Sequence, residues 1–196
     1  HPKDFFAGAK RSEYVFRPDA RSGRVVRYSF KFMFPEEFFK TRKEKDWVII
    51  QQWHDEPPTG TVWAEYQENT KPPMALLIGL KTDGAPTIEF KYGLKSNSYD
   101  QDLTVMYPER LRAGEWYTFA NEILWSDLEG VGYAKPKLND VYFVQNDVNS
   151  ENKVTGQNMY NSVANYYKMG LYGNKKSQDT IYFFLDEFKY ETLENR

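Results

Sequence analysis

The chain has 196 residues, and its 26 Lys and Arg against 28 Asp and Glu give a net charge of -2, which argues against broad attraction to nucleic acid or to an anionic membrane. The sequence contains no cysteine, which excludes disulfides, zinc–thiolate sites and thiol nucleophiles, and no apolar run approaches the ~18 residues of a membrane span. Hydrophobic residues are 40% and aromatic residues 17% of the chain, which excludes a disordered composition and favours β-strands.

Alternation of apolar and polar residues between turn residues predicts that strands dominate the chain. The first clear run, Arg24–Phe34, alternates aromatic and aliphatic residues with Arg27, Ser29 and Lys31. A charged connector follows at Glu36–Lys45, where one or two helical turns are expected. Further strands are predicted, in chain order, at Trp47–His54, Met74–Lys81, Thr87–Lys95, Leu103–Tyr107, Glu115–Ser126, Val141–Val144, Tyr166–Gly173 and Thr180–Tyr190.

The number and spacing of these strands predict an all-β fold. About nine or ten short strands, joined by Gly, Pro and Asn turns, are typical of an antiparallel β-sandwich of the concanavalin-like jelly-roll type. The segments Asp55–Pro73 and Gln145–Asn161 are rich in turn-forming and polar residues and are predicted to be loops. Because no linker separates the strands, residues 1–196 are predicted to form one domain.

His54 is the candidate for imidazole chemistry, because the other histidine, His1, is the first residue of the chain. The period of two along a strand places Gln52 and His54 on the same face. An amide and an imidazole are costly to bury unless they find partners or face a solvated cleft. A lone histidine in a strand is more often structural than catalytic, so the residues around His54 must distinguish the two roles.

A second polar stripe is predicted on the strand Tyr166–Gly173, where Tyr166, Lys168 and Tyr172 share a face. Gly170 lies between them, and a glycine inside a strand often marks a bulge or the close approach of a ligand. We expect it to leave open space on this face. A strand with one exposed lysine is the simpler interpretation of this segment.

A third segment, residues 11–14, reads Arg-Ser-Glu-Tyr, and its arginine and glutamate share a face and can form an ordinary surface pair. In this order the three segments resemble the motifs of jelly-roll polysaccharide lyases, including the alginate lyases. Gln52–His54 and the closing residues 181–186 are more similar to the heparin lyase I and glucuronan lyase group. The resemblance spans about residues 11–190, but the chain is too short for the thumb-like insertion of heparin lyase I, and residues 173–174 depart from the alginate lyase pattern.

The resemblance implies that the chain cleaves a uronic-acid polymer by β-elimination and leaves an unsaturated uronate end. By resemblance and by chemistry alike, Gln52 and Arg11 are expected to neutralise the substrate carboxylate. His54 and Tyr172 are expected to be the acid–base residues. Substrate-binding residues are expected at Lys168, Tyr166, Trp63 and Tyr66, the last two as a cleft wall chosen from aromatic placement alone.

No cofactor is expected to be required. Some members of the resembled group carry a structural calcium ion, for which Asp186 is the one candidate ligand. The expected partner is an anionic polysaccharide, with unsulfated glucuronan or alginate favoured over heparin, and neither nucleic acid nor a membrane. The chain is expected to be a monomer that is secreted or periplasmic.

Two other classes stay open at this point. A glycoside hydrolase on a related sandwich needs two carboxylates flanking the bond, but the nearest match to Glu-x-Asp-x-x-Glu has Ile49 in the third acidic position. A non-catalytic carbohydrate-binding module would explain the aromatic content and the missing cysteines. It would not explain three motifs in lyase order.

Overall fold

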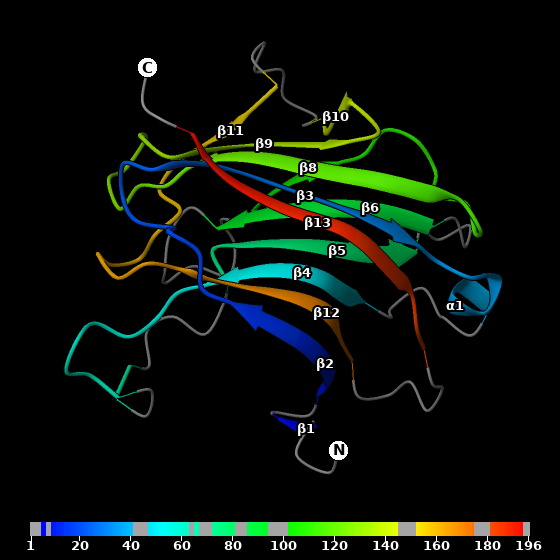
Figure 1. Ribbon diagram of the computed structural model, residues 1–196, viewed down its shortest axis with the longest axis horizontal. Coiled ribbons are helices and arrows are strands. Elements are labelled where there is room, and N and C mark those ends of the chain that lie inside the picture. The colour runs from blue at the N-terminus through cyan, green and yellow to red at the C-terminus, as the bar shows by residue number, and fades with distance from the viewer. Residues whose placement is uncertain are drawn as a thin grey trace.

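In the computed structural model the chain folds into two antiparallel β-sheets that lie face to face (Figure 1). The structure describes residues 5–6, 9–40, 47–62, 65–66, 72–80, 86–93, 102–144, 152–174 and 181–193. Within them the prediction of an all-β antiparallel sandwich is confirmed. The short helix α1 (Glu36–Lys40) lies where a helical turn was expected, and no helix in the described ranges is long and apolar enough to cross a membrane.

The first sheet has seven strands, and it joins segments from both ends of the sequence. Its β12 lies between β2 and β4, so residues far apart in the chain are direct neighbours (Figure 1). In spatial order the strands are β1 (Phe5–Phe6), β2 (Ala9–Phe16), β12 (Tyr166–Asn174), β4 (Val48–His54), β5 (Met74–Leu80), β6 (Pro86–Gly93) and β7 (Asp102–Met106).

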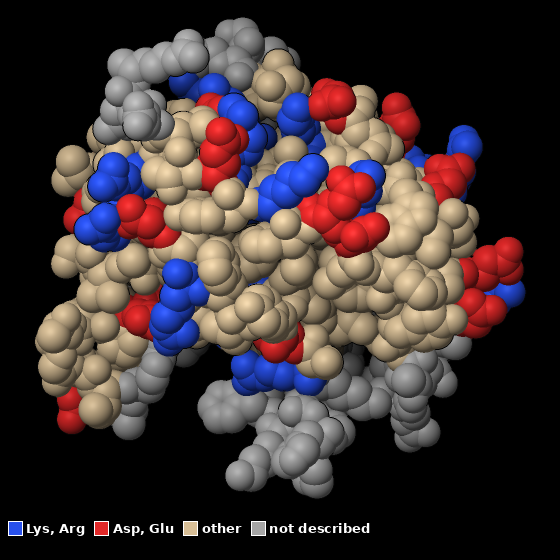
Figure 2. Space-filling view, viewed as in Figure 1, with Lys and Arg blue, Asp and Glu red and all other residues tan. Residues whose placement is uncertain are grey.

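The second sheet has six strands and covers one face of the first. In spatial order they are β10 (Val141–Tyr142), β9 (Tyr133–Leu138), β8 (Trp116–Leu124), β3 (Val25–Met33) and β13 (Phe184–Leu193), with β11 (Val154–Thr155) paired to β9. Buried and partly exposed residues alternate along β3, because one face packs on the core and the other faces solvent. Figure 2 shows basic and acidic side chains beside one another on one face of the molecule, without a large patch of one sign.

An aromatic cluster fills the space between the sheets and fixes which face of β4 points outward. Trp53 is 1% exposed and packs against Tyr28, Trp125 and Tyr167 at ring-centroid distances of 4.1, 5.1 and 4.5 Å. Burying one large apolar side chain stabilises a fold by about 1.5–3 kcal/mol. Because Trp53 is anchored in the core, its neighbours along β4 face away from the second sheet.

Several regions differ from the sequence prediction. β2 and β9 were not predicted as strands, since β2 carries charged residues and β9 contains Pro136, which has no N–H for a sheet hydrogen bond. The predicted loop Gln145–Asn161 contains the two-residue β11. The last strand was predicted at Thr180–Tyr190 but runs from Phe184 to Leu193.

Candidate functional site

The residues predicted to carry chemistry lie on three adjacent strands, β2, β12 and β4, of the first sheet. Cross-strand partners in a sheet point to the same face. The pairs are Tyr172 with Arg11, Lys168 with Gln52, and Tyr166 with His54. Their face is opposite to the one that carries Trp53 and Tyr167 into the core. We call Arg11, Glu13, Gln52, His54, Tyr166, Lys168 and Tyr172 the polar array.

Gly170, in the middle of the array, is required by the backbone of β2. The pairing of β12 with β4 shifts register between Met169 and Tyr172, and Gly170 has a φ of 148° there. A Cβ atom at this position would lie 2.1 Å from the main-chain oxygen of Ser12. The expectation that Gly170 leaves open space is therefore wrong: the residue marks a bulge and a close approach of β2.

Gln52 is held in place by Glu13. The Gln52 side chain is 2% exposed, and its Nε2 donates a hydrogen bond to Glu13 Oε1. A carboxylate can only accept, which fixes the amide with its nitrogen toward Glu13. The amide nitrogen of Gln52 carries two hydrogens, so its second N–H is also held in a fixed orientation.

His54 is packed between an aromatic ring and an acidic residue. Its side chain is 14% exposed, and its ring stacks on Tyr166 at 5.4 Å with an interplanar angle of 23°. Nδ1 lies 3.1 Å from the main-chain oxygen of Asp55. Because a carbonyl oxygen accepts, Nδ1 donates, and the basic nitrogen of the neutral ring is Nε2.

Burial changes the acidity of two members of the array. Burial, followed by the charges of Asp55 and Glu56, raises the pKa of Tyr166 to about 12, so its hydroxyl stays protonated near neutral pH. Burial lowers the pKa of Lys168 against the opposing charge of Glu13, and the nearby Arg11 cation lowers it further. Lys168 Nζ lies 5.2 Å from the centre of the Tyr166 ring, which places the ammonium among the other polar groups.

The far end of the array is formed by Tyr172 and its neighbours. The Arg11 guanidinium lies 5.5 Å from the centre of the Tyr172 ring, and the Trp47 ring packs edge-on at 5.3 Å. Tyr172 pairs with Ile49, five residues from His54 on β4, a separation of roughly 16 Å along the strand. Tyr172 and His54 therefore lie at opposite ends of the array.

Of the two predicted cleft-wall residues, Tyr66 lies in the part of the chain that the structure describes. Trp63 is outside the described residues. Tyr66 Oη accepts a hydrogen bond from Asn161 Nδ2 at 3.0 Å, and the same nitrogen donates to the main-chain oxygen of Glu56. Tyr66 is thereby tied to the segment that follows His54.

The surroundings of Asp186 do not fit a calcium site. Asp186 lies on β13 in the second sheet, with Lys31 as its cross-strand partner, and its Oδ1 accepts the main-chain N–H of Glu187 at 2.8 Å. Lys31 forms an ion pair with Glu187. Calcium takes six to eight oxygen ligands, whereas the described part of the chain contains no cluster of three acidic or histidine side chains that could hold a metal.

Sequence reasoning missed Asp55 and Lys91. Asp55 directly follows His54 but was placed in a loop, and its 1% exposure depends on tertiary packing. The register places Lys91 in one row with Gln52, separated by Ala75. Lys91 lies within the predicted strand Thr87–Lys95, but only the order of strands in the sheet brings it into the row of Gln52.

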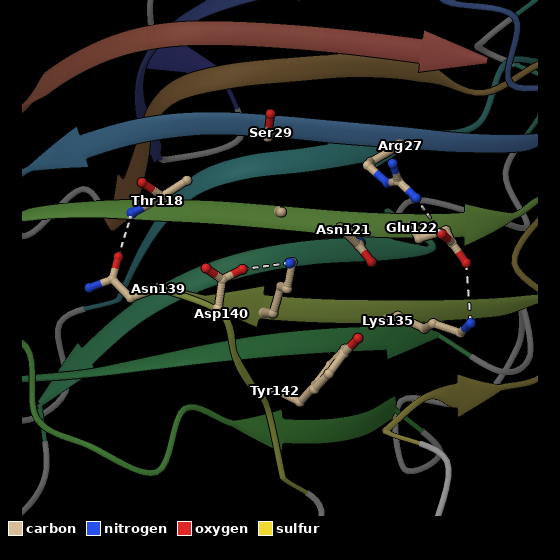
Figure 3. Close-up of a pocket in the computed structure, with 11 residues that line it drawn as sticks. Arg27, Ser29, Thr118, Asn121, Glu122, Lys135, Asn139, Asp140 and Tyr142 are labelled. Carbon is tan, nitrogen blue, oxygen red and sulfur yellow. Dashed lines mark hydrogen bonds and ion pairs between the residues drawn. The ribbon is translucent and has the colours of Figure 1, made fainter. Parts of the chain in front are cut away.

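A hollow of about 760 Å³ lies on the opposite side of the sandwich, on β3, β8, β9 and the turn to β10 (Figure 3). Its charged side chains form ion pairs with one another: Glu122 lies 3.0 Å from Arg27 and 3.2 Å from Lys135, and Lys137 lies 2.6 Å from Asp140. An anionic ligand would have to break these pairs, so we place the candidate site at the array.

Comparisons with known proteins give one family and several similar folds. A family model described as polysaccharide lyase matches residues 1–189. Endo-β-1,4-glucuronan lyase from the fungus Trichoderma reesei is similar at 18% identity and a TM-score of 0.63, over 94% of this chain and 75% of that one. The alginate lyase AlyC3 has 9% identity and a TM-score of 0.64, over 94% and 72%.

A GH131 β-glucanase catalytic domain from Podospora anserina is also similar, at 14% identity and a TM-score of 0.53, over 96% of this chain and 66% of that one. At these identities the structural likenesses establish the fold alone. A search of curated proteins gives no match.

Proposed function

Because the chain belongs to the polysaccharide lyase family, we propose that it cleaves a uronic-acid polymer by β-elimination at the polar array. The observation that supports this most is the register of β2, β12 and β4, which puts Arg11, Gln52, His54 and Tyr172 on one face. These residue types supply the cation, amide donor, base and acid that the reaction needs.

The elimination makes two demands on the protein. A base removes the C5 proton, the C5–H electrons form the C4–C5 double bond, and the C4–O4 bond breaks with its electron pair on O4, which takes a proton. The C5 proton is a very weak acid until the neighbouring carboxylate is neutralised. Donors or cations must therefore be aimed at that carboxylate, where charge develops in the transition state.

Gln52 and Arg11 are proposed to neutralise the carboxylate, with Lys168 in support. The amide of Gln52 is oriented by Glu13 before substrate arrives, which lowers the cost of ordering it on binding. Arg11 carries a planar, permanently charged fork that suits a carboxylate. Lys168 pairs in register with Gln52 and adds a cation to the same row.

The acid–base roles follow from the geometry of the sugar. Where C5–H and O4 point to the same side, as in glucuronate and mannuronate, Tyr172 can remove the C5 proton and return it to O4. Where they point to opposite sides, as in guluronate and iduronate, His54 Nε2 takes the proton and Tyr172 protonates O4. Both arrangements use residues of the array, and polymannuronate against polyguluronate as substrate distinguishes them.

Unsulfated polyuronates are the proposed substrates. In and beside the array the basic Arg11, Lys168 and Arg17 are matched by the acidic Glu13, Asp55 and Glu56, and Arg17 forms an ion pair with Glu56. A highly sulfated polymer would favour a clear excess of positive charge. The chain is proposed to act as a secreted or periplasmic monomer.

A panel of glucuronan, polymannuronate, polyguluronate, hyaluronan and heparin tests the proposal through the ultraviolet absorbance of the unsaturated product. We expect a rise on an unsulfated polyuronate, and a loss of ~10²–10⁴-fold in Tyr172→Phe with binding retained. Tyr142→Phe is the matched control, because Tyr142 is 36% exposed on the opposite side of the sandwich. A flat trace on every polymer, with the protein folded, contradicts the proposal.

A further inference from the structure

Asp55, the residue after His54, carries a buried carboxylate. It is 1% exposed, and neither of its carboxylate oxygens accepts a hydrogen bond of good geometry from the described residues. Buried carboxylates are costly unless a partner compensates the charge. Within the described ranges, the ion-pair contact of this carboxylate is with the ring of His54.

Two oxygens of Asp55 face the same nitrogen of that ring. His54 Nδ1 lies 3.1 Å from the main-chain oxygen and 3.1 Å from Oδ1. A carbonyl and an ionised carboxylate can only accept, so Nδ1 must carry a proton. The lone pair of the neutral ring then lies on Nε2, the nitrogen that a base would use.

We propose that Asp55 is a positioning residue that keeps His54 in the Nδ1–H tautomer and stabilises the imidazolium formed when Nε2 takes a proton. The inference deepens the proposed function and rests on it, since it concerns the acid–base role of His54. A carboxylate behind a catalytic imidazole has the same part in the Ser–His–Asp triad. If the Asp55 carboxylate only anchored the segment after β4, the pH at which His54 takes up its second proton would not depend on it.

The other groups around the ring come from β2, β12 and the segment after β4. Tyr166 stacks on one face of the ring. The charged groups nearby are Glu13, Arg17, Glu56 and Lys168. Of these, Glu56 is engaged by Arg17, so its charge is balanced within that pair. Asp55 is the carboxylate placed against Nδ1.

The test is the tautomer of His54, read by long-range ¹H–¹⁵N NMR on the full chain. The sequence has two histidines, so the spectrum of His54→Gln identifies the signals of His1. In wild type the neutral ring of His54 is expected to be in the Nδ1–H form. In Asp55→Asn the ring of His54 is expected to take up its second proton at lower pH, because a neutral amide stabilises the imidazolium less than a carboxylate. Glu56→Gln, which removes one negative charge a single residue further on, is expected to keep the wild-type tautomer and to shift the midpoint less than Asp55→Asn does.

Turnover on the polymer that wild type cleaves gives a second reading. Asp55→Asn is expected to lose up to ~10⁴-fold in kcat with KM little changed. The acidic limb of its rate profile should move to lower pH. Equal kcat in this variant and wild type contradicts the proposal.

The NMR readings decide independently of activity. A wild-type ring with its proton on Nε2 overturns the proposal, and so does an Asp55→Asn spectrum with the wild-type tautomer and midpoint. If this variant does not fold, Asp55→Ser takes its place in both readings, because it also removes the carboxylate and keeps the main-chain oxygen. Absence of cleavage on every polymer would contradict the proposed function and leave these readings standing.

Discussion

Gly170→Ala tests how the fold builds the array. At this position a Cβ atom would lie 2.1 Å from the main-chain oxygen of Ser12, and φ is 148°. Backbone strain in such a region costs about 1–3 kcal/mol, and crowding a packed site adds about 1–3 kcal/mol. We expect a loss of about 3–5 kcal/mol in the free energy of unfolding. At about 2–4 °C per kcal/mol for a chain of this size, Tm should fall by about 6–20 °C.

Gly114→Ala is the matched control for Gly170→Ala. Gly114 also has a positive φ, of 76°, but nothing lies within 4 Å of its Cβ position, so only the backbone cost of about 1–2 kcal/mol applies. Urea unfolding and thermal melts measure both variants. Activity measured below both transitions should fall in Gly170→Ala alone, because the bulge sets the register of Tyr172 against β4. Equal losses of stability in the two variants would refute the reasoning.

Further outcomes are expected at other sites. Lys168→Met should weaken the binding of an anionic oligosaccharide, measured by calorimetry. Because burial and Arg11 lower the pKa of Lys168, the affinity of wild type should fall as the pH rises through that pKa. The affinity of the variant should not change over this pH range. Trp53→Ala should cost about 3–5 kcal/mol in urea unfolding. Burial raises the pKa of Glu122, but hydrogen bonds from Arg27 and Lys135 outweigh burial and lower it. Glu122→Gln should therefore reduce Tm above pH 4.5, its ordinary value, and the difference should vanish as the pH falls through the lowered pKa. A chelator should leave turnover unchanged, because the proposed elimination uses side chains alone, and a loss would contradict this.

The fold and the faces of the motif strands were predictable because the strand period is set by backbone geometry. The alternation of Arg24–Phe34 records which face of β3 enters the core. The same period put Gln52 and His54 on one face and Trp53 on the other. These predictions need only local sequence and the preference of apolar side chains for the interior.

The pairing of strands was not predictable from local sequence. β2 has little apolar alternation, and it is a strand because β12 pairs along most of its length. The reason for a glycine at position 170 is the close approach of β2, and β2 also supplies the Glu13 that contacts Gln52. Asp55 follows a strand and resembles a turn residue, and only the packed structure reveals that it is buried against His54.

The isotopic composition of the product tests the central claim most directly. The polymer that the chain cleaves is digested in ¹⁸O-labelled water, and the masses of the product oligosaccharides are measured by mass spectrometry. Elimination adds no water, so we predict products with one unsaturated end at each cut and no ¹⁸O from the cleavage step. Products with saturated ends that carry one ¹⁸O atom per cut would contradict the account and assign the polar array to hydrolysis.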